Sequence, residues 1–231
     1  MSEATRVISL LPSVTETLRA WGHDPIACTR FCEQPDLPAV GGTKDPDLAA
    51  IIALRPELVV MDEEENRRED AEALAAAGVE LFVTAVRSVD EVGPTLRDLA
   101  DAVGFDQLHL APDAGAPAQL RGARRGFVPI WRNPWMTISA ATYGSSLLEA
   151  LGVANVFAGH PDRYPTLDGL GGIDADLVVA PSEPYPFTER QRPELEAVAP
   201  VTFVDGRDLF WWGVRTPAAR ERLSRGLDLP R

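Results

Sequence analysis

The chain has 231 residues, of which 45% are hydrophobic and 25% charged, the composition of an ordinary globular protein. Its formal net charge of −13 at pH 7 argues against binding to nucleic acid or to an anionic membrane surface, because both require a basic patch. No run of about 18 apolar residues occurs, so no membrane-spanning helix is predicted.

The first residues indicate a compartment. Residues 1–6 lack the basic start of a secretory signal, and the apolar run at 7–11 is short and followed by Pro12. We therefore expect a cytoplasmic chain; the alternative is the cell envelope, if the start is trimmed or mis-set. In the cytosol Cys28 and Cys32 are expected to be free thiols, and a single C-x3-C pair is a weak zinc motif.

The first half of the chain alternates strands and helices. Ser13 and Glu16 have the spacing of a capping box, and Asp45-Pro46 reads as a second helix start. The pattern predicts strands at 6–11, 26–29, 58–61 and 81–84, and helices at 13–22, 45–54 and 67–77. Strands that alternate with helices in this way predict a parallel α/β unit.

The second half begins after one further helix. A second capping box at Ser88 and Glu91 predicts a helix that ends at Gly104, followed by a Pro/Gly-rich loop at 111–117. Beyond it we expect strands at 127–130, 136–140, 177–179 and 201–204, and helices at 145–151 and 217–225.

The element order of the first half recurs in the second. The capped helix at 13–22 matches the segment at 143–152, each closed by glycine, and the strand at 58–60 matches 177–179. The predicted fold is therefore α/β, with two Rossmann-like lobes of parallel sheet joined by a helix and a ligand cleft between them. The predicted boundaries are 1–88 for the first lobe, 89–126 for the linking helix and connector, and 127–231 for the second lobe.

Few enzyme motifs occur. The chain has no G-x-S-x-G, G-x-G-x-x-G or H-E-x-x-H sequence; Gly41 to Lys44 only resembles the end of a phosphate loop, and three scattered histidines do not make a metal site. Aromatic residues instead follow several predicted strands, where open α/β sheets bind ligands. Each alone could simply fill the core, but as a set they favour a flat apolar ligand.

An acidic run, 62–65, lies between a strand and a helix. Such a run is usually only the solvated start of a helix, where negative charges interact favourably with the helix dipole. A docking role for one or two of its carboxylates is the less common alternative.

The chain resembles the class III, helical-backbone periplasmic substrate-binding proteins of the cobalamin and iron-chelate type. The resemblance extends over nearly the whole chain and rests on residues 6–16, 40–44, 54–60, 131–136, 151–157 and 205–213. It implies a solute-binding protein of an ABC importer, or a cytosolic relative, and not an enzyme. It also implies a corrinoid as ligand or a related metal chelate, no catalytic cofactor, no protein-bound metal and a monomer.

The resemblance also implies site residues. The first lobe would contribute Pro12, Ser13, Phe31, Cys32, Gly42, Lys44 and Glu63 to the ligand site, and the second Trp131, Trp135, Tyr185 and Trp211. Glu65 or Glu69 would dock on arginines of a membrane permease, while the second lobe offers no clear docking carboxylate. The sequence departs from the family in lacking an export signal and in a shortened joining helix, interrupted near 111–117.

Two other functions stay open at this point. An enzyme could use the same cleft, with Asp62, Glu63 or Cys32 as acid, base or nucleophile. A protein-interaction module could receive a partner loop on its aromatic residues. Neither has a motif that supports it.

Overall fold

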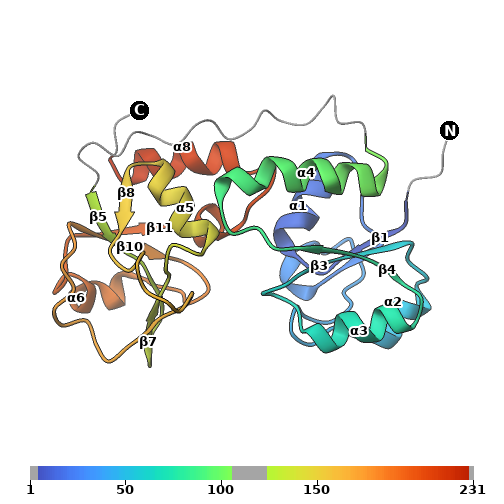
Figure 1. Cartoon of the computed structure of the whole chain (residues 1–231), viewed down its shortest axis with the longest axis horizontal. Coiled ribbons are helices and arrows are strands. Elements are labelled where there is room, and N and C mark those ends of the chain that lie inside the picture. Colours follow the sequence, from blue (N-terminus) through green and yellow to red (C-terminus); the bar gives the residue numbers. More distant parts are fainter. Residues whose placement is uncertain (1–4, 106–123, 229–231) are drawn as a thin grey trace. The chain divides into compact units, whose positions relative to one another are not determined.

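The computed structural model describes residues 5–105 and 124–228 (Figure 1). The chain divides into two compact units. The first contains the described residues of Met1–Ala85 and Val92–Pro112, with Trp212–Val214; the second contains Val86–Glu91, the described residues of Asp113–Trp211, and those of Arg215–Arg231. The boundaries expected from the sequence stay a prediction, and the loop at 111–117 lies outside the described residues.

The first unit is built on a parallel four-stranded sheet. Its strands are β1 (Val7–Ser9), β2 (Ala27–Cys28), β3 (Leu58–Asp62) and β4 (Glu80–Thr84), in the order β2-β1-β3-β4. The connecting helices are α1 (Pro12–Ala20), the 3-10 helix η1 (Arg30–Cys32), α2 (Leu48–Ala53) and α3 (Arg68–Ala76). After β4 comes α4 (Val89–Val103), whose first residues belong to the second unit and the rest to the first.

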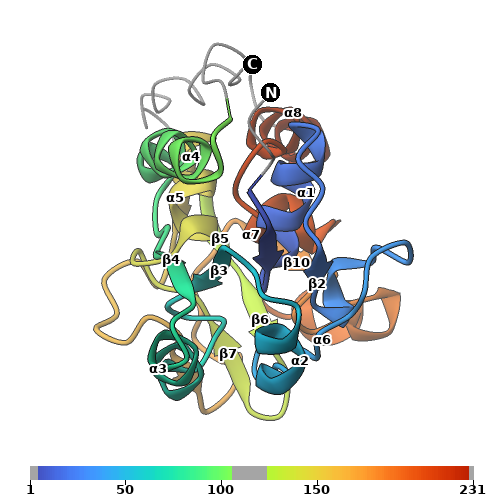
Figure 2. The same ribbon diagram turned by 90° about the vertical axis from the view of Figure 1, so that its right-hand side faces the viewer.

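Helices cover both faces of this sheet. Successive strand residues point to opposite faces, and because both faces carry apolar side chains, both must be buried. α2 and α3 lie on one side of the strands and α1 on the other (Figures 1 and 2). Ile8, Val59 and Met61 pack with Ile51 of α2 and Leu74 of α3 in one buried cluster. The central strand β3 is therefore buried along its whole length and has a continuous apolar run, as expected for a strand covered on both faces, whereas the edge strand β4 is partly exposed.

The second unit repeats this topology. Its parallel sheet contains β5 (Arg124–Phe127), β8 (Val153–Asn155), β10 (Leu177–Pro181) and β11 (Val201–Val204), in the order β8-β5-β10-β11. In both units the first strand therefore pairs with the strand that follows the next long helix, here α5 (Tyr143–Ala150). The prediction of two similar α/β lobes with parallel sheets is confirmed.

The second unit also carries a small antiparallel sheet. Its strands are β6 (Pro129–Trp131), β7 (Trp135–Thr137) and β9 (Thr166–Leu167). The predicted single strand at 127–130 is wrong, because its residues divide between β5 of the parallel sheet and β6 of the antiparallel one. The remaining elements are η3 (Glu189–Gln191), α6 (Arg192–Leu195), α7 (Gly206–Phe210) and α8 (Thr216–Gly226).

Two predicted helix starts are wrong. α1 begins at Pro12 with Leu11 as N-cap, and no side chain caps it, because Pro12 occupies the first helical position and places Ser13 inside the helix. α2 is capped by Asp47, whose carboxylate accepts a hydrogen bond from the backbone N–H of Ala50 at 2.9 Å, and not by Asp45.

Candidate functional site

In the first unit, the predicted site residues gather at one edge of the sheet. Pro12 and Ser13 follow β1, Phe31 and Cys32 follow β2, and Glu63 follows β3. The carboxyl ends of parallel strands meet at the same edge, which is where open α/β sheets bind ligands. Ser13 and Cys32 are buried, whereas Phe31 is 50% exposed.

Phe31 is supported by a residue that sequence reasoning missed. The Arg30 guanidinium lies 4.8 Å from the Phe31 ring centroid and donates to both carboxylate oxygens of Asp45, at 2.9 and 3.0 Å. Gly42 lies beside this ion pair: a Cβ there would come within 2.4 Å of Asp45 Oδ1 and 2.7 Å of Arg30 Nη2, the ends of two exposed side chains.

Cys32 is buried and contacts neighbouring hydroxyl groups. Its sulfur lies 3.2 Å from the hydroxyl of Thr15 and 3.2 Å from that of Thr29, and both Cys28 and Cys32 are buried free thiols. The interaction between the two neighbouring thiols lowers the pKa of Cys32 and raises that of Cys28. With 3% of its surface exposed, Cys32 offers little access to a ligand or a substrate.

The acidic loop after β3 is organised by its one buried carboxylate. Asp62 accepts hydrogen bonds from the backbone N–H groups of Glu64 and Glu65, at 2.9 and 3.3 Å, and from the Thr84 hydroxyl at 2.7 Å. Burial raises the pKa of Asp62, against the opposing effect of the Thr84 hydrogen bond. Asp62 therefore has a structural role, while its neighbour Glu63 is exposed.

Lys44 is joined to this loop. Its ammonium donates to the carbonyl of Glu64, and the Asn66 amide donates to the carbonyl of Thr43 at 2.9 Å. The structure thus brings Lys44 together with the acidic loop. Glu65 and Glu69, the docking candidates, are both exposed, on this loop and on the first turn of α3.

In the second unit, three predicted site residues belong to one group of rings, here called the aromatic cluster: Trp131, Trp135, Tyr185 and Phe187. Trp131 meets Tyr185 edge to face at 5.7 Å between centroids, Tyr185 lies 4.7 Å from Phe187, and Phe187 stacks on Trp135 at 6.0 Å. The rings come from β6, β7 and the loop after β10. Phe187, missed as a site residue, is the buried centre that joins the others.

The outer members of the aromatic cluster are accessible. Trp131 is 43% exposed, and Trp135 and Tyr185 are half-buried. Arg132 fixes the turn between β6 and β7: it donates to both oxygens of Glu194, at 2.9 and 2.7 Å, and lies 5.9 Å from the Trp135 ring. The aromatic cluster therefore exposes ring surface beside a turn that the Arg132–Glu194 ion pair holds in place.

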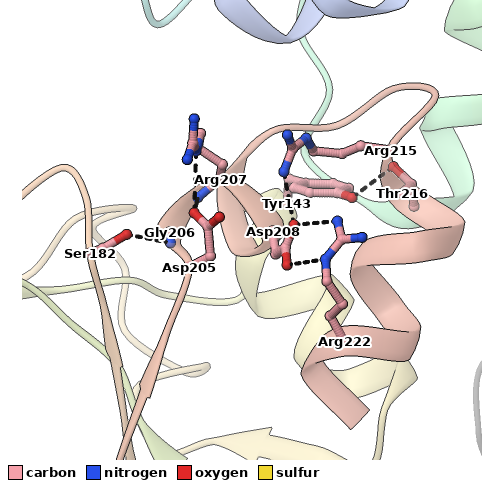
Figure 3. A network of polar contacts seen from close by, with 9 residues as sticks. All are labelled: Tyr143, Ser182, Asp205, Gly206, Arg207, Asp208, Arg215, Thr216 and Arg222. Atoms are coloured by element: carbon pink, nitrogen blue, oxygen red, sulfur yellow. Dashed lines mark hydrogen bonds and ion pairs between the residues drawn. The ribbon is translucent and has the colours of Figure 1, made fainter. Parts of the chain in front are cut away.

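Trp211 lies elsewhere in this unit, directly after α7. It is flanked by Arg207 and Arg215, and no described ring contact joins it to the aromatic cluster. Figure 3 shows the network around α7, in which Arg215 and Arg222 both donate to Asp208. Within the described residues, no group of three or more His, Cys, Asp or Glu side chains could hold a metal ion, and no helix is long and apolar enough to cross a membrane.

No family model matches the chain, but known proteins resemble it. A vitamin B12-binding protein of Salmonella choleraesuis (strain SC-B67) is 27% identical over 175 residues, which are 70% of this chain and 66% of that protein. The matched region thus spans slightly less than two thirds of the relative.

Two solved structures define the fold. The periplasmic vitamin B12-binding protein BtuF of Vibrio cholerae has a TM-score of 0.73 at 19% identity, covering 97% of both chains. The periplasmic heme-binding protein RhuT from Roseiflexus sp. RS-1 has a TM-score of 0.75 at 20% identity, covering 97% of this chain and 98% of that one. The chain has the fold of the periplasmic binding proteins.

These findings confirm the resemblance to class III substrate-binding proteins of the cobalamin and iron-chelate type. The similar proteins are binding proteins and not enzymes. The expected cytoplasmic location is wrong, because the similar structures are of periplasmic proteins. That expectation rested on the first few residues of the sequence, whereas the likeness to the periplasmic proteins extends over nearly the whole chain. The individual site residues stay predictions.

Proposed function

We propose that this chain is a solute-binding protein whose ligand is a corrinoid or a closely related metal chelate. The observation that carries the proposal is the aromatic cluster, in which the exposed Trp131 is in edge-to-face contact with Tyr185. A corrin or porphyrin is a broad, flat and largely apolar ring system, and partly exposed indole and phenol rings stack on such surfaces while their polar atoms reach water. The similarity to a vitamin B12-binding protein supports the corrinoid as first choice.

The first unit contributes Phe31 in the same manner. Its ring is half exposed and rests on a guanidinium that Asp45 holds in place. A ring fixed in this way loses little conformational freedom on binding, which favours affinity. Pro12, Ser13, Gly42, Lys44 and Glu63 lie at or beside the same sheet edge, and their contact with ligand is part of the proposal. The expectation of a ligand cleft between the lobes stays a prediction.

Binding without catalysis is part of the proposal. Among the side chains suggested for an enzyme, Cys32 and Asp62 are buried and hydrogen-bonded to neighbouring threonines and backbone groups. A nucleophile or base must reach substrate within hydrogen-bonding distance, which such burial opposes. That the similar proteins are binding proteins favours the same conclusion.

The proposed setting is uptake across the cell envelope. Exposed Glu65 and Glu69 would dock on arginines of an ABC permease, as the family resemblance implies. Both belong to a chain of net charge −13, which favours approach to a basic surface over long distances.

A titration of ligand-free protein with cyanocobalamin tests the proposal, with tryptophan quenching and corrin absorbance retained after desalting as readouts. We expect stoichiometric retention at micromolar concentration. Trp131→Phe should weaken binding several-fold, because a smaller ring loses stacking area. Trp21→Phe is the matched control, since Trp21 stacks on Phe105 at 4.8 Å in the first unit. If the protein retained none of the three compounds cyanocobalamin, dicyanocobinamide and hemin, the proposal would be overturned.

A further inference from the structure

The chain contains two cysteines, and the fold of the first unit brings them together. Cys28 ends β2 and Cys32 ends η1, and the chain turns back between them, because the backbone N–H of Cys32 donates to the carbonyl of Thr29 at 3.1 Å. Both side chains are buried, with 1% and 3% of their surface exposed, and the two thiols interact directly. Neighbouring thiols of this kind are within reach of a disulfide bond, whose Cβ atoms lie about 4 Å apart.

Hydrogen bonds fix the backbone on both sides of Cys28. Its N–H donates to the carbonyl of Pro38 at 3.0 Å, and its carbonyl accepts from the N–H of Val40 at 2.9 Å. Cys28 also lies opposite Ser9 in the parallel pairing of β1 with β2. The movement that closes a bond between the two sulfurs therefore belongs to Cys32, which lies outside the sheet.

The sulfur of Cys32 lies beside groups that favour its thiolate form. It is 3.2 Å from the hydroxyl of Thr15 in α1 and 3.2 Å from the hydroxyl of Thr29. The interaction with Cys28 and the contacts with these hydroxyls lower the pKa of Cys32 against the effect of burial, and the same interaction raises the pKa of Cys28. A thiolate beside a thiol is the arrangement used in thiol–disulfide exchange, because the thiolate attacks first and the second sulfur then closes the bond.

A bond between these sulfurs encloses residues of the candidate site. Thr29, Arg30 and Phe31 lie between the two cysteines in the sequence. Arg30 lies against the half-exposed ring of Phe31 and donates to the carboxylate of Asp45. A covalent link across this segment restricts the unfolded chain and thereby stabilises the folded loop that carries Phe31.

The compartment decides whether such a pair is oxidised. The expectation of free thiols depended on a cytosolic location, which the likeness to periplasmic proteins contradicts. Disulfides form and persist in the bacterial periplasm, whereas cytosolic thiols are kept reduced. The structure describes the two cysteines as thiols, which is the form that precedes oxidation.

We propose that Cys28 and Cys32 form a disulfide bond in the oxidising cell envelope, and that this bond stabilises the first unit at the loop of Phe31. The inference rests on the envelope setting given under the proposed function. Because both sulfurs are buried in the folded chain, the bond forms while the chain folds and is then protected from reductants.

The oxidant is a protein that carries a reactive disulfide. The Cys32 thiolate attacks one of its sulfurs, so a mixed disulfide forms and the other sulfur of the oxidant leaves as a thiolate. Cys28 then loses its proton and displaces the oxidant from Cys32. The two cysteines lose two electrons and two protons in total, and the disulfide of the oxidant is reduced to a dithiol.

Refolding of the full chain from urea tests the proposal, with glutathione disulfide in place of the protein oxidant and reduced glutathione beside it. The refolded chain is treated with N-ethylmaleimide in urea, and its mass is measured. We expect no maleimide on the wild type, and a mass lower by two hydrogen atoms than that of the reduced chain. After dithiothreitol in urea, the same protein should take up two maleimides.

Thermal unfolding measures the stabilisation. The oxidised wild type should melt several degrees above the wild type refolded with dithiothreitol, because the cross-link restricts the unfolded chain. The double variant Cys28→Ser with Cys32→Ser is the control, and it should melt at the same temperature under both conditions.

The mass of the wild type decides the question even if the double variant fails to fold. Two maleimides on the chain refolded with glutathione disulfide, or a glutathione that stays attached, would show that the pair does not close and would overturn the inference. Equal melting temperatures of the oxidised and reduced wild type would overturn the stabilising role. No ligand enters these measurements, so a chain that forms the bond but retains no chelate overturns the proposed function alone.

Discussion

Buried carboxylates have different environments in the two units, and their neighbours decide their charge. Burial raises the pKa of Asp62, which has hydroxyl and backbone donors as partners. Burial also raises the pKa of Asp208, but the ion pairs with Arg222 and Arg215 outweigh it and lower that pKa below its usual range. Asp208 is therefore a buried carboxylate whose ionised form stabilises the fold.

The first residue-scale prediction concerns Asp208→Asn. Removing one partner of a buried ion pair leaves the other charge with poor compensation, so we expect a loss of about 3 kcal/mol in the free energy of unfolding. Urea unfolding followed by circular dichroism measures it. Asp174→Asn is the matched control, because the pair of Asp174 with Arg125 is exposed and should contribute far less.

The effect of Asp208→Asn should depend on pH in a definite direction. Since the folded-state pKa of Asp208 is lowered, its stabilisation is fully present above the unfolded-state value of about 3.9. It is lost as the pH falls through the folded-state pKa. The difference between wild type and variant should thus be constant from pH 6 to 8 and shrink below about pH 4. A difference that persists unchanged into acid would contradict the role given to the ionised carboxylate.

At the scale of elements, the loop that follows β2 depends on a close backbone approach. Gly41 has a φ of 89°, and its carbonyl accepts from the backbone N–H of Arg30 at 2.9 Å. A Cβ at Gly41 would lie 2.5 Å from the carbonyl oxygen of Asp45 and 2.8 Å from the backbone nitrogen of Asp47. The loop that supports Arg30 and Phe31 therefore leaves no room for a side chain there.

A comparison of Gly41→Ala with Gly78→Ala separates two penalties at position 41: that of a left-handed backbone for alanine, and that of steric overlap with nearby backbone atoms. Both glycines have φ near 80 to 90°, but nothing lies within 4 Å of a Cβ at Gly78. Gly78→Ala should cost about 1 kcal/mol, the penalty for a left-handed alanine. Gly41→Ala should cost clearly more, because backbone atoms must shift as well. Thermal and urea unfolding measure both, and equal losses would argue against the close approach.

At the scale of the whole molecule, both units, which have the same strand order, contribute residues to the proposed solute-binding function. The proposed docking carboxylates, Glu65 and Glu69, belong to the first unit, and the aromatic cluster belongs to the second. Substitution of these two carboxylates should therefore leave the contacts within the aromatic cluster unchanged.

The variant Glu65→Gln with Glu69→Gln tests the docking role. We expect its affinity for cyanocobalamin to be unchanged and its capture of an ABC importer from solubilised membranes of the source organism to fall at least several-fold, because rim charges govern association. Glu72→Gln with Glu80→Gln is the control, as both are exposed carboxylates of the same unit. Equal capture by both double variants would contradict the docking role.

Much of this protein follows from its sequence. Apolar runs such as 58–61, and glycines after helices, predict the elements of both units, because periodicity and chain reversal are local properties. The repeated element order predicts two similar sheets. Proline and aromatic residues after strands indicate, in each unit separately, the edge of the parallel sheet at which Phe31 or Tyr185 lies, since parallel strands end on one side.

Other features depend on contacts between distant residues, which local patterns do not encode. The helix starts at Ser13 and Asp45 were predicted wrongly, because Pro12 and Asp47 compete for the same roles within a few residues. Phe187 contacts both Trp135 and Tyr185. Arg30 lies against the ring of Phe31. Asp208 binds one arginine from α8 and one from the loop before it. The sequence by itself determined the class of fold and the kind of residue at the sheet edges. The tertiary structure alone decided which rings and charges meet, because those partners are brought together by packing and not by spacing along the chain.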